Sequence, residues 1–490
     1  MTPDLDSRLP DRVYAHASPR SIGSTSLFDA DQITVANATQ FMSRENATDR
    51  AIDVLGQEGF EILGHSTTTL HIAGPPELYQ DFFRTTLITS SQGVISPGAA
   101  LPWGTYRYID TPDTRRRGLI ATERDDLRGF LEGVALEQPA LLFSDIGPAP
   151  ELPYWHLTLD QVAEHLGARA LHDEGLTGDG VRLTMIDSGW EELPYFTEHK
   201  YAGTVVLGPQ AANAHRDEEG HGTSESANAF SVAPGITFTM VKVGGANLVG
   251  AFEAALGQDE LPDIISISLG FQAKRQLAAD DLVLSAKIAL AVLAGVTVVC
   301  ASGNGHHAFP GQHPDVISVG GVHLDRNGEA EASDYASGYV SGVFPGRTVP
   351  DVSGLVGMQP GAAYIMLPAP PGSAIDRRRA VPDDEDGDGR PDWEGDGTLP
   401  DDGWIVASGT SAAAPQVAGV CALLKQAYPS LTPDGLRRAL QKGARDVTRG
   451  VSNPATGGRA GDGPDDATGY GLARADEALR HLRRPRAASG

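Results

Sequence analysis

Short apolar runs alternate with longer stretches of helical spacing through the central part of the chain. The predicted strands are 181–187, 204–208, 237–243, 263–269, 297–302 and 316–322, and the predicted helices are 280–295 and the stretch after His221. Because these strands are apolar almost throughout, both of their faces are expected to be buried. The alternation predicts an α/β fold with a parallel sheet and helices on both of its faces.

The pattern before residue 151 differs and predicts a second, smaller unit. Residues 1–45 are polar and aperiodic, 46–110 follow a helix, strand, strand, helix order, and 111–150 are mixed in character and end in a proline-rich stretch. We interpret these as an N-terminal segment, a small α+β domain and a linker. Residues 151–490 then form the α/β domain, with an acidic insertion at 376–403.

The charge and the apolar content of the chain limit the kinds of molecule it is expected to bind. The chain has 64 Asp and Glu against 38 Lys and Arg, a net charge of −26, which argues against a nucleic-acid partner and favours cations as ligands. No apolar stretch approaches the 18 residues of a membrane span, and the first residues lack a signal-peptide core, so we expect no membrane partner and a cytoplasmic protein, with non-classical secretion left open. Cys300 and Cys421 lie in apolar runs and are expected to be buried free thiols rather than a disulfide.

One serine has unusually small neighbours. In "WIVASGTSAAAPQVAGV", residues 404–420, Ser411 stands between Gly409-Thr410 and three alanines, where an apolar helix begins. Small neighbours leave the hydroxyl accessible, and the positive end of a helix dipole favours negative charge that develops nearby. This stretch alone fits a nucleophile or a plain helix-capping serine.

A serine nucleophile needs a base and a carboxylate to orient that base. Asp187 ends an apolar strand in "MIDSGW", and His221 lies between two glycines before a helix of small residues. Taken singly, these residues also fit a turn-capping aspartate and a surface histidine. Their joint occurrence in the order Asp, His, Ser favours a catalytic triad.

Four motifs carry a resemblance to a known family. "IDSG" around Asp187, "GHGT" around His221, "ASGNG" around Asn304 and "SGTSAAAPQVAGV" around Ser411 resemble, in this order, the motifs of the subtilase family of serine proteases. The resemblance implies a subtilisin-like fold and a serine endopeptidase acting on a peptide or protein substrate. It makes Ser411 the nucleophile, His221 the general base, Asp187 its orienting partner and Asn304 an oxyanion donor, with no cofactor for catalysis.

A fifth motif, "ISLG", resembles the family's substrate strand, which implies that Ser268, Leu269 and Gly270 pair with an extended peptide. Further downstream, "FPGRTVPDVSG" and "GTSAAAP" look like the related sedolisins, which use carboxylates where this chain keeps His221 and Asn304. A histidine base must be neutral, so activity is expected near neutral or higher pH, with loss as pH falls through about 6.5.

Two acidic segments suggest structural calcium. The alternation in "DEDGDGRPD" is typical of a loop that wraps oxygen ligands around Ca²⁺, although Gly395 stands where a bidentate glutamate is expected, and a solvated acidic insertion is the alternative. "ARDVTRG" and "GPDDATGYG" resemble the two parts of the sedolisin calcium site. The candidate ligands are Asp384, Asp386, Asp388 and Asp392 in the first segment and Asp446, Val447 and Asp465 in the second.

The α+β unit fits the size and position of the family's propeptide, which implies intramolecular inhibition of the catalytic domain; an unrelated accessory domain is equally consistent with its sequence. The arginines of "DTRRRGL" fit an exposed cutting point or a basic solvated linker. Two further functions stay open beside the endopeptidase. They are a catalytically silent peptide-binding homologue and an esterase or amidase that uses the same triad.

Overall fold

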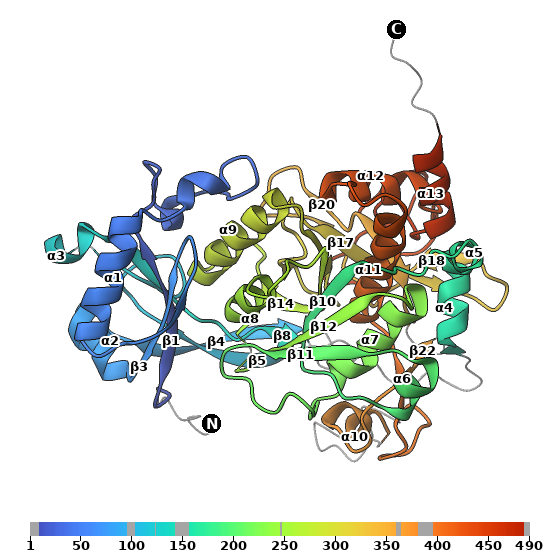
Figure 1. Cartoon of the computed structure of the whole chain (residues 1–490), viewed down its shortest axis with the longest axis horizontal. Helices are drawn as coiled ribbons and strands as arrows, with labels where there is room; N and C mark the ends of the chain where they lie inside the picture. The colour runs from blue at the N-terminus through green and yellow to red at the C-terminus, as the bar shows by residue number, and fades with distance from the viewer. Residues whose placement is uncertain are drawn as a thin grey trace, which may run out of the picture.

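The computed structural model describes residues 9–95, 103–122, 124–142, 156–245, 247–358, 364–380 and 395–484. A small N-terminal domain lies against one side of a larger α/β domain, with helices α8 (Leu248–Leu256) and α9 (Ala279–Leu293) of the larger domain nearest to it (Figure 1). Among the described residues, no helix is both long and apolar enough to cross a membrane.

The N-terminal domain is a five-stranded antiparallel sheet with order β2-β3-β1-β7-β6, covered by two helices. Its elements are β1 (Val13–Pro19), α1 (Glu45–Gln57), β2 (Glu61–His65), β3 (Leu70–Gly74), α2 (Pro76–Phe83), β6 (Leu119–Ile120), α3 (Asp125–Arg128) and β7 (Leu131–Leu136), with two 3₁₀ turns, Leu27–Asp29 and Ala38–Phe41. One face buries its own apolar core, to which Ala15, Ile72, Tyr79 and Val134 belong.

The structure corrects the predicted limits of this domain. Segment 1–45 supplies the central strand β1, and the predicted linker supplies β6 and β7, so both belong to the sheet. The pairing of β7 with β1 spans more than a hundred residues and leaves no local signal. Arg116 and Arg117 are half-buried: Arg116 donates to the Leu277 carbonyl at 3.1 Å and Arg117 to the Tyr106 hydroxyl at 3.2 Å, so the arginine stretch is more a domain contact than an exposed loop.

The larger domain is built on an eight-stranded sheet with order β11-β12-β10-β13-β15-β17-β18, in which β21 also pairs with β17. Its strands are β10 (Arg182–Asp187), β11 (Gly203–Leu207), β12 (Thr237–Lys242), β13 (Ile264–Ile267), β15 (Thr297–Ala301), β17 (Ile317–Leu324), β18 (Ala330–Ala332) and β21 (Val352–Leu355). All pairings are parallel except that of β18. The prediction of a parallel α/β sheet is confirmed.

Helices cover both faces of this sheet, as its two-sided apolar strands require. The remaining helices are α4 (Leu159–His165), α5 (Ala168–Asp173), α6 (Pro194–His199), α7 (His221–Val232), α10 (Ala374–Ala380), α11 (Thr410–Ala427), α12 (Pro433–Gly443) and α13 (Ala475–Arg483). Along β15, Val299 packs into the core that contains α7 and α11, and Cys300 into the core that contains α8 and α9. Cys300 and Cys421 are buried free thiols, as predicted.

Short strands frame the edge of the sheet where the chemistry-bearing residues lie. They are β8 (Leu141–Leu142), β9 (His156–Leu157), β14 (Leu269–Gln272), β16 (Ala308–Phe309), β19 (Tyr339–Val340), β20 (Thr348–Val349), β22 (Tyr364–Pro368) and β23 (Trp404–Ala407). In addition, β4 (Ile88–Ile95) and β5 (Trp103–Asp110) form an antiparallel pair that lies between β1 and the larger domain in the view of Figure 1. One side of β14 is paired with β8, a strand that comes from the part of the chain before residue 151.

Candidate active site

Asp187 and His221 form a hydrogen-bonded pair at the carboxyl end of the parallel sheet. Asp187 is the last residue of β10, and His221 is the first residue of α7. The Nδ1 atom of His221 lies 2.7 Å from Asp187 Oδ1, and both side chains are fully buried. The backbone N–H of Ser188 donates to the same carboxylate oxygen at 2.7 Å. A proton held on Nδ1 by this carboxylate leaves Nε2 as the basic nitrogen of the ring.

The glycines on either side of His221 are required by close packing. Gly220 has φ 93°, a left-handed conformation that favours glycine, and any Cβ there would lie 2.4 Å from Ser373 Oγ. A Cβ on Gly222 would lie 2.4 Å from the Gly189 carbonyl oxygen and 3.0 Å from Asp187 Cβ. The motif therefore lets the first turn of α7 approach the Asp187 loop closely enough for the hydrogen bond to form.

The environment of His221 favours the charged ring in the intact chain. Burial by itself lowers the pKa of His221, but the negative charge of Asp187 and the hydrogen bond to it outweigh burial and raise the pKa to about 9. Glu225 and Glu219 act in the same direction. The His221 ring therefore holds a proton at neutral pH in the intact chain, and it can act as a base only when that proton is lost.

Ser411 lies in the first turn of α11, directly after Thr410, and its side chain is fully buried. Its hydroxyl is 3.4 Å from the Ser268 carbonyl oxygen, and Ser268 Oγ donates to the Ser411 carbonyl at 3.1 Å. Helix α11 packs along α7, where Gln416 donates to the Asn228 side chain at 3.1 Å. The serine motif, the histidine motif and the "ISLG" strand therefore meet at one edge of the sheet.

Asn304 reaches the same place from the loop after β15. Its side-chain carbonyl accepts from the Thr410 backbone N–H at 2.8 Å and from the Thr410 hydroxyl at 2.9 Å, and the side chain is fully buried. Holding the carbonyl oxygen fixes the direction of the amide NH₂, which is the donor an oxyanion needs. Thr410 thus holds the Asn304 amide in place, a contact that was not predicted from sequence although Thr410 stands beside Ser411 in the same motif.

The predicted substrate strand is paired with a segment of the same chain. In an antiparallel register, Leu269 lies opposite Leu142 and Gly270 opposite Leu141. From Leu141 to Leu142 the chain runs toward Ser268, whose carbonyl is next to the Ser411 hydroxyl. Strand β8, which comes from the N-terminal part of the chain, thus pairs with β14 and runs toward Ser411.

A second ionisable side chain lies one turn after His221. Glu225 is buried on α7 and accepts from Asn228 Nδ2 at 2.9 Å. Burial, together with the charge of Asp187, raises the pKa of Glu225 to about 7, although His221 opposes the shift. Glu225 was not among the residues predicted from sequence, although its spacing of four residues from His221 on a helix was an available signal.

The predicted calcium ligands divide into two groups. Asp384, Asp386, Asp388 and Asp392 lie outside the described residues. In the second group, Asp465 accepts from the backbone N–H groups of Gly461 at 2.9 Å and Thr468 at 2.7 Å, and Asp446 accepts from Gly463 at 2.9 Å. These two carboxylates stabilise the turn at 461–468. Among the described residues, Asp446 and Asp465 do not belong to any group of three ligand side chains close enough to bind one metal ion.

The comparison with known families agrees with this geometry. A model described as the subtilase family matches residues 178–471, which include Asp187, His221, Asn304 and Ser411. The chain belongs to the subtilase family. The match covers most of the α/β domain and leaves out the five-stranded N-terminal domain. The resemblance inferred from the motifs is confirmed.

Several subtilases are similar to this chain at moderate identity. The chain is 28% identical over 312 residues to serine protease AprX of Bacillus subtilis (strain 168), in a match that covers 57% of this subtilase and 65% of AprX. It is 27% identical over 294 residues to subtilisin Savinase of Lederbergia lenta, covering 56% and 88%.

Among solved structures, fervidolysin of Fervidobacterium pennivorans, described as a keratinolytic enzyme related to subtilisin, matches with TM-score 0.56 and 16% identity. That alignment covers 99% of this chain and 63% of fervidolysin, and at this identity it shows a common fold. The chain thus spans less than two thirds of the length of AprX or of fervidolysin.

Proposed function

We propose that this subtilase is a serine endopeptidase that cleaves peptide bonds through an acyl-enzyme on Ser411. The observation that carries the proposal is the buried 2.7 Å bond between Asp187 and His221 at the sheet edge where Ser411 begins α11. An acyl-transfer site needs this combination of nucleophile, base and orienting carboxylate.

In this mechanism His221 Nε2 takes the proton of the Ser411 hydroxyl as the oxygen attacks the peptide carbonyl. Asp187 keeps the other ring proton on Nδ1 and stabilises the imidazolium that forms. The tetrahedral oxyanion is bound by the Asn304 amide and the backbone N–H of Ser411. His221 then gives its proton to the leaving amine, and water hydrolyses the acyl-enzyme by the same route in reverse.

The pairing of β14 favours peptides over other acyl substrates. An extended chain already lies on this strand in antiparallel register, so the strand offers backbone hydrogen bonds that a small ester does not use. An esterase or amidase remains the second candidate, because the same triad supports it. A silent peptide-binding homologue is disfavoured by the presence of all four motif residues.

We further propose that the N-terminal domain keeps the intact chain latent. Strand β8 is paired with one edge of β14, the predicted substrate strand. The side chains of Asp187, His221, Asn304 and Ser411 have no exposed surface. A peptide substrate needs the place that β8 holds. Cleavage shortly after Leu142, followed by release of the domain, would open the site.

Structural calcium remains part of the proposal, with the acidic segment at 384–392 as its main candidate. A folded-state ion raises stability by mass action, so a calcium chelator should lower the melting temperature. Replacing Asp386 and Asp388 together by alanine should remove part of that response. No dependence on millimolar calcium would make the segment a solvated insertion.

The deciding test compares the parent protein with Ser411→Ala. A fluorophosphonate probe should label the parent only, and casein hydrolysis should fall by several orders of magnitude in the variant. Mass spectrometry of the same samples should find a new N-terminus shortly after residue 142 in the parent and an uncut chain in the variant. Equal labelling of the two proteins would exclude Ser411 as the nucleophile.

A further inference from the structure

Two buried histidines and a glutamate lie together where the N-terminal domain meets the catalytic domain. His16 on β1 and His71 on β3 are cross-strand partners, and Glu137 follows the end of β7. The exposed fraction is 0% for the His16 side chain, 3% for His71 and 11% for Glu137. Among the described residues, this is the one group of three potential ligand side chains close enough to share a metal ion.

Strand alternation explains why these polar residues face the catalytic domain. Val13, Ala15 and Ala17 of β1 point into the core of the N-terminal domain, so His16 points to the opposite face. His71 is its direct neighbour on β3, and their rings stack with centroids 4.8 Å apart and an interplanar angle of 18°. An interface buried this deeply is normally filled by apolar side chains, unless polar groups there have partners.

Both histidines direct their Nε2 atoms toward the same carboxylate oxygen of Glu137. Glu137 Oε1 is 3.2 Å from His16 Nε2 and 2.8 Å from His71 Nε2, and the three ligand atoms lie within 4.8 Å of one another. The two Nε2 atoms share this single oxygen as ion-pair partners, and Nδ1 of His16 is buried without a hydrogen-bond partner. Such a nitrogen costs free energy, commonly about 1–3 kcal/mol.

We propose that His16, His71 and Glu137 bind one Zn²⁺ ion. Two imidazoles and a carboxylate are a ligand set that suits zinc, and three protein ligands leave a fourth position for water. Bonds of 2.0–2.1 Å in a tetrahedral site place ligand atoms about 3.3 Å apart, so the two histidine–glutamate separations already nearly fit. Closing the site requires a small adjustment of side chains.

The catalytic domain supplies the groups that orient the carboxylate ligand. Asn247 Nδ2 donates to Glu137 Oε1 at 2.6 Å, and Gln210 Nε2 donates to Glu137 Oε2 at 3.3 Å. Asn247 is itself fixed, because its Oδ1 caps helix α8 through the Gly250 N–H at 2.8 Å. Docking of the N-terminal domain therefore orients the Glu137 ligand, so the ion would bind the docked form more tightly and stabilise it.

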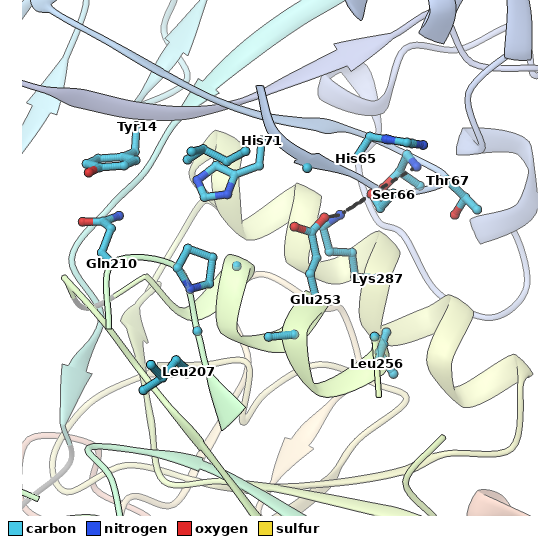
Figure 2. Close-up of a pocket in the computed structure, with 18 of the residues that line it drawn as sticks. Tyr14, His65, Ser66, Thr67, His71, Leu207, Gln210, Glu253, Leu256 and Lys287 are labelled. Atoms are coloured by element: carbon cyan, nitrogen blue, oxygen red, sulfur yellow. Dashed lines mark hydrogen bonds and ion pairs between the residues drawn. The ribbon is translucent and has the colours of Figure 1, made fainter. Parts of the chain in front are cut away.

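A cavity between the domains gives an ion access to the site. It has a volume of about 750 Å³ and is lined by His71 and Tyr14 on one side and by Gln210 and Glu253 on the other. Figure 2 shows the His71 ring facing this cavity, between Tyr14 and the Glu253–Lys287 pair. The cavity can hold the water that completes the coordination of zinc.

The test uses the full chain carrying Ser411→Ala, so that no self-cleavage removes the N-terminal domain. The protein is stripped of metal and titrated with Co²⁺, whose visible absorption reports a site of low coordination number, and Zn²⁺ is then added as a competitor. We expect one Co²⁺ per chain and its displacement by one Zn²⁺. Zinc should also raise the melting temperature of this protein.

Four substitutions decide whether the binding belongs to this cluster. His71→Gln and Glu137→Gln should weaken Zn²⁺ binding by more than about 100-fold, and Asn247→Ala by about 10- to 100-fold through loss of orientation. His65→Gln is the matched control, because His65 lines the same cavity but is exposed. It should leave binding unchanged.

Folding is checked by cooperative melting without metal. If His71→Gln fails that check, Glu137→Gln, which preserves the size of the side chain and one acceptor oxygen, decides alone. Absence of stoichiometric Co²⁺ binding, or equal binding by Glu137→Gln and His65→Gln, would overturn the proposal and leave the three residues as a polar domain contact.

Discussion

Thr410 holds the side-chain carbonyl of Asn304 twice, through its backbone N–H at 2.8 Å and its hydroxyl at 2.9 Å. The residue before the proposed nucleophile therefore also aims the proposed oxyanion donor. Loss of the hydroxyl should let the amide rotate away from the developing negative charge, while the substrate strand is untouched.

We therefore expect Thr410→Val to lower kcat by roughly tenfold with little change in KM, a smaller loss than the about 100- to 1,000-fold for Asn304→Ala. Thr410→Ser keeps a hydroxyl and should restore most of the rate. Steady-state kinetics on a peptide substrate measure all three variants. A Thr410→Val variant with parental kcat would show that Asn304 needs no such support.

The Asp187–His221 pair sets the pH dependence of the nucleophile. The base works only when its ring is neutral, so reactivity should fall as pH drops through the His221 pKa, which is raised toward about 9 in the intact chain. The rate of fluorophosphonate labelling should rise through an alkaline inflection. In Asp187→Asn the rate should fall by about 10⁴-fold, because the tautomer is no longer fixed. In the full chain carrying Ser411→Ala, which keeps β8 in place, an NMR titration of the His221 ring should give a pKa near 9, and a value near 6.5 would contradict the raised pKa.

The same pair links stability to pH in a defined direction. His221 has a higher pKa folded, about 9, than unfolded, about 6.5, so its contribution is fully present below pH 6.5 and is lost as pH rises through 9. In the Ser411→Ala background, the free energy of unfolding should fall across this window by up to roughly 3 kcal/mol. Asp187→Asn should flatten the dependence. Urea unfolding at pH 6 and pH 9 provides the measurement.

A buried ion pair gives the "FPGRTVPDVSG" segment a structural role. Arg347 donates two hydrogen bonds to the Asp351 carboxylate, at 2.7 and 2.6 Å. Asp351 also accepts a hydrogen bond from the Ser318 N–H at 2.8 Å. Burial tends to raise the pKa of Asp351, but the charge of Arg347 overrides this effect and lowers it. The Arg347–Asp351 pair thus stabilises the fold of this segment, and the proposed catalytic residues remain His221 and Asn304.

Arg347→Met should cost about 3–5 kcal/mol in urea unfolding, because it leaves a buried carboxylate unpaired. Adding Asp351→Asn should recover part of that loss. Arg326→Met, at an exposed arginine nearby in sequence, is the control and should change stability by less than about 0.5 kcal/mol. Equal stability of Arg347→Met and the control would show that the pair contributes nothing.

The sequence predicted those parts of the molecule that depend on local pattern. The apolar strands, the buried thiols and the glycine-flanked His221 all follow from residues near one another in the chain. The N-terminal limits were predicted wrongly because β1 and β7 pair with each other across more than a hundred residues, which leaves no local pattern.

Within the site, the sequence predicted Asp187, His221, Asn304 and Ser411, which the structure places at one edge of the sheet, and it did not predict the side chains that contact them. Thr410 and Glu225 have no special signal beyond their spacing from Ser411 and His221. The cluster of His16, His71 and Glu137 could not be foreseen either, because two strands and the residue after a third become neighbours only in the folded sheet.

Lys287 offers a last test, directed at the contact between the two domains. This lysine of α9 is 4% exposed and donates to Ser66 at 2.7 Å and Thr69 at 3.0 Å in the β2–β3 turn, while Glu253 balances its charge at 2.5 Å (Figure 2). Hydrogen bonds to a charged donor contribute about 1.5–3 kcal/mol each, so losing them should weaken docking of the N-terminal domain.

Residues 1–150, added in trans to refolded 151–490, should inhibit peptide hydrolysis about 10- to 100-fold less well when the larger fragment carries Lys287→Met with Glu253→Gln. The paired substitution avoids an unpaired buried carboxylate, and Lys442→Met on the exposed face of α12 should leave inhibition at the parental level. Equal inhibition of all three would place the latency in β8 alone rather than in the docked domain.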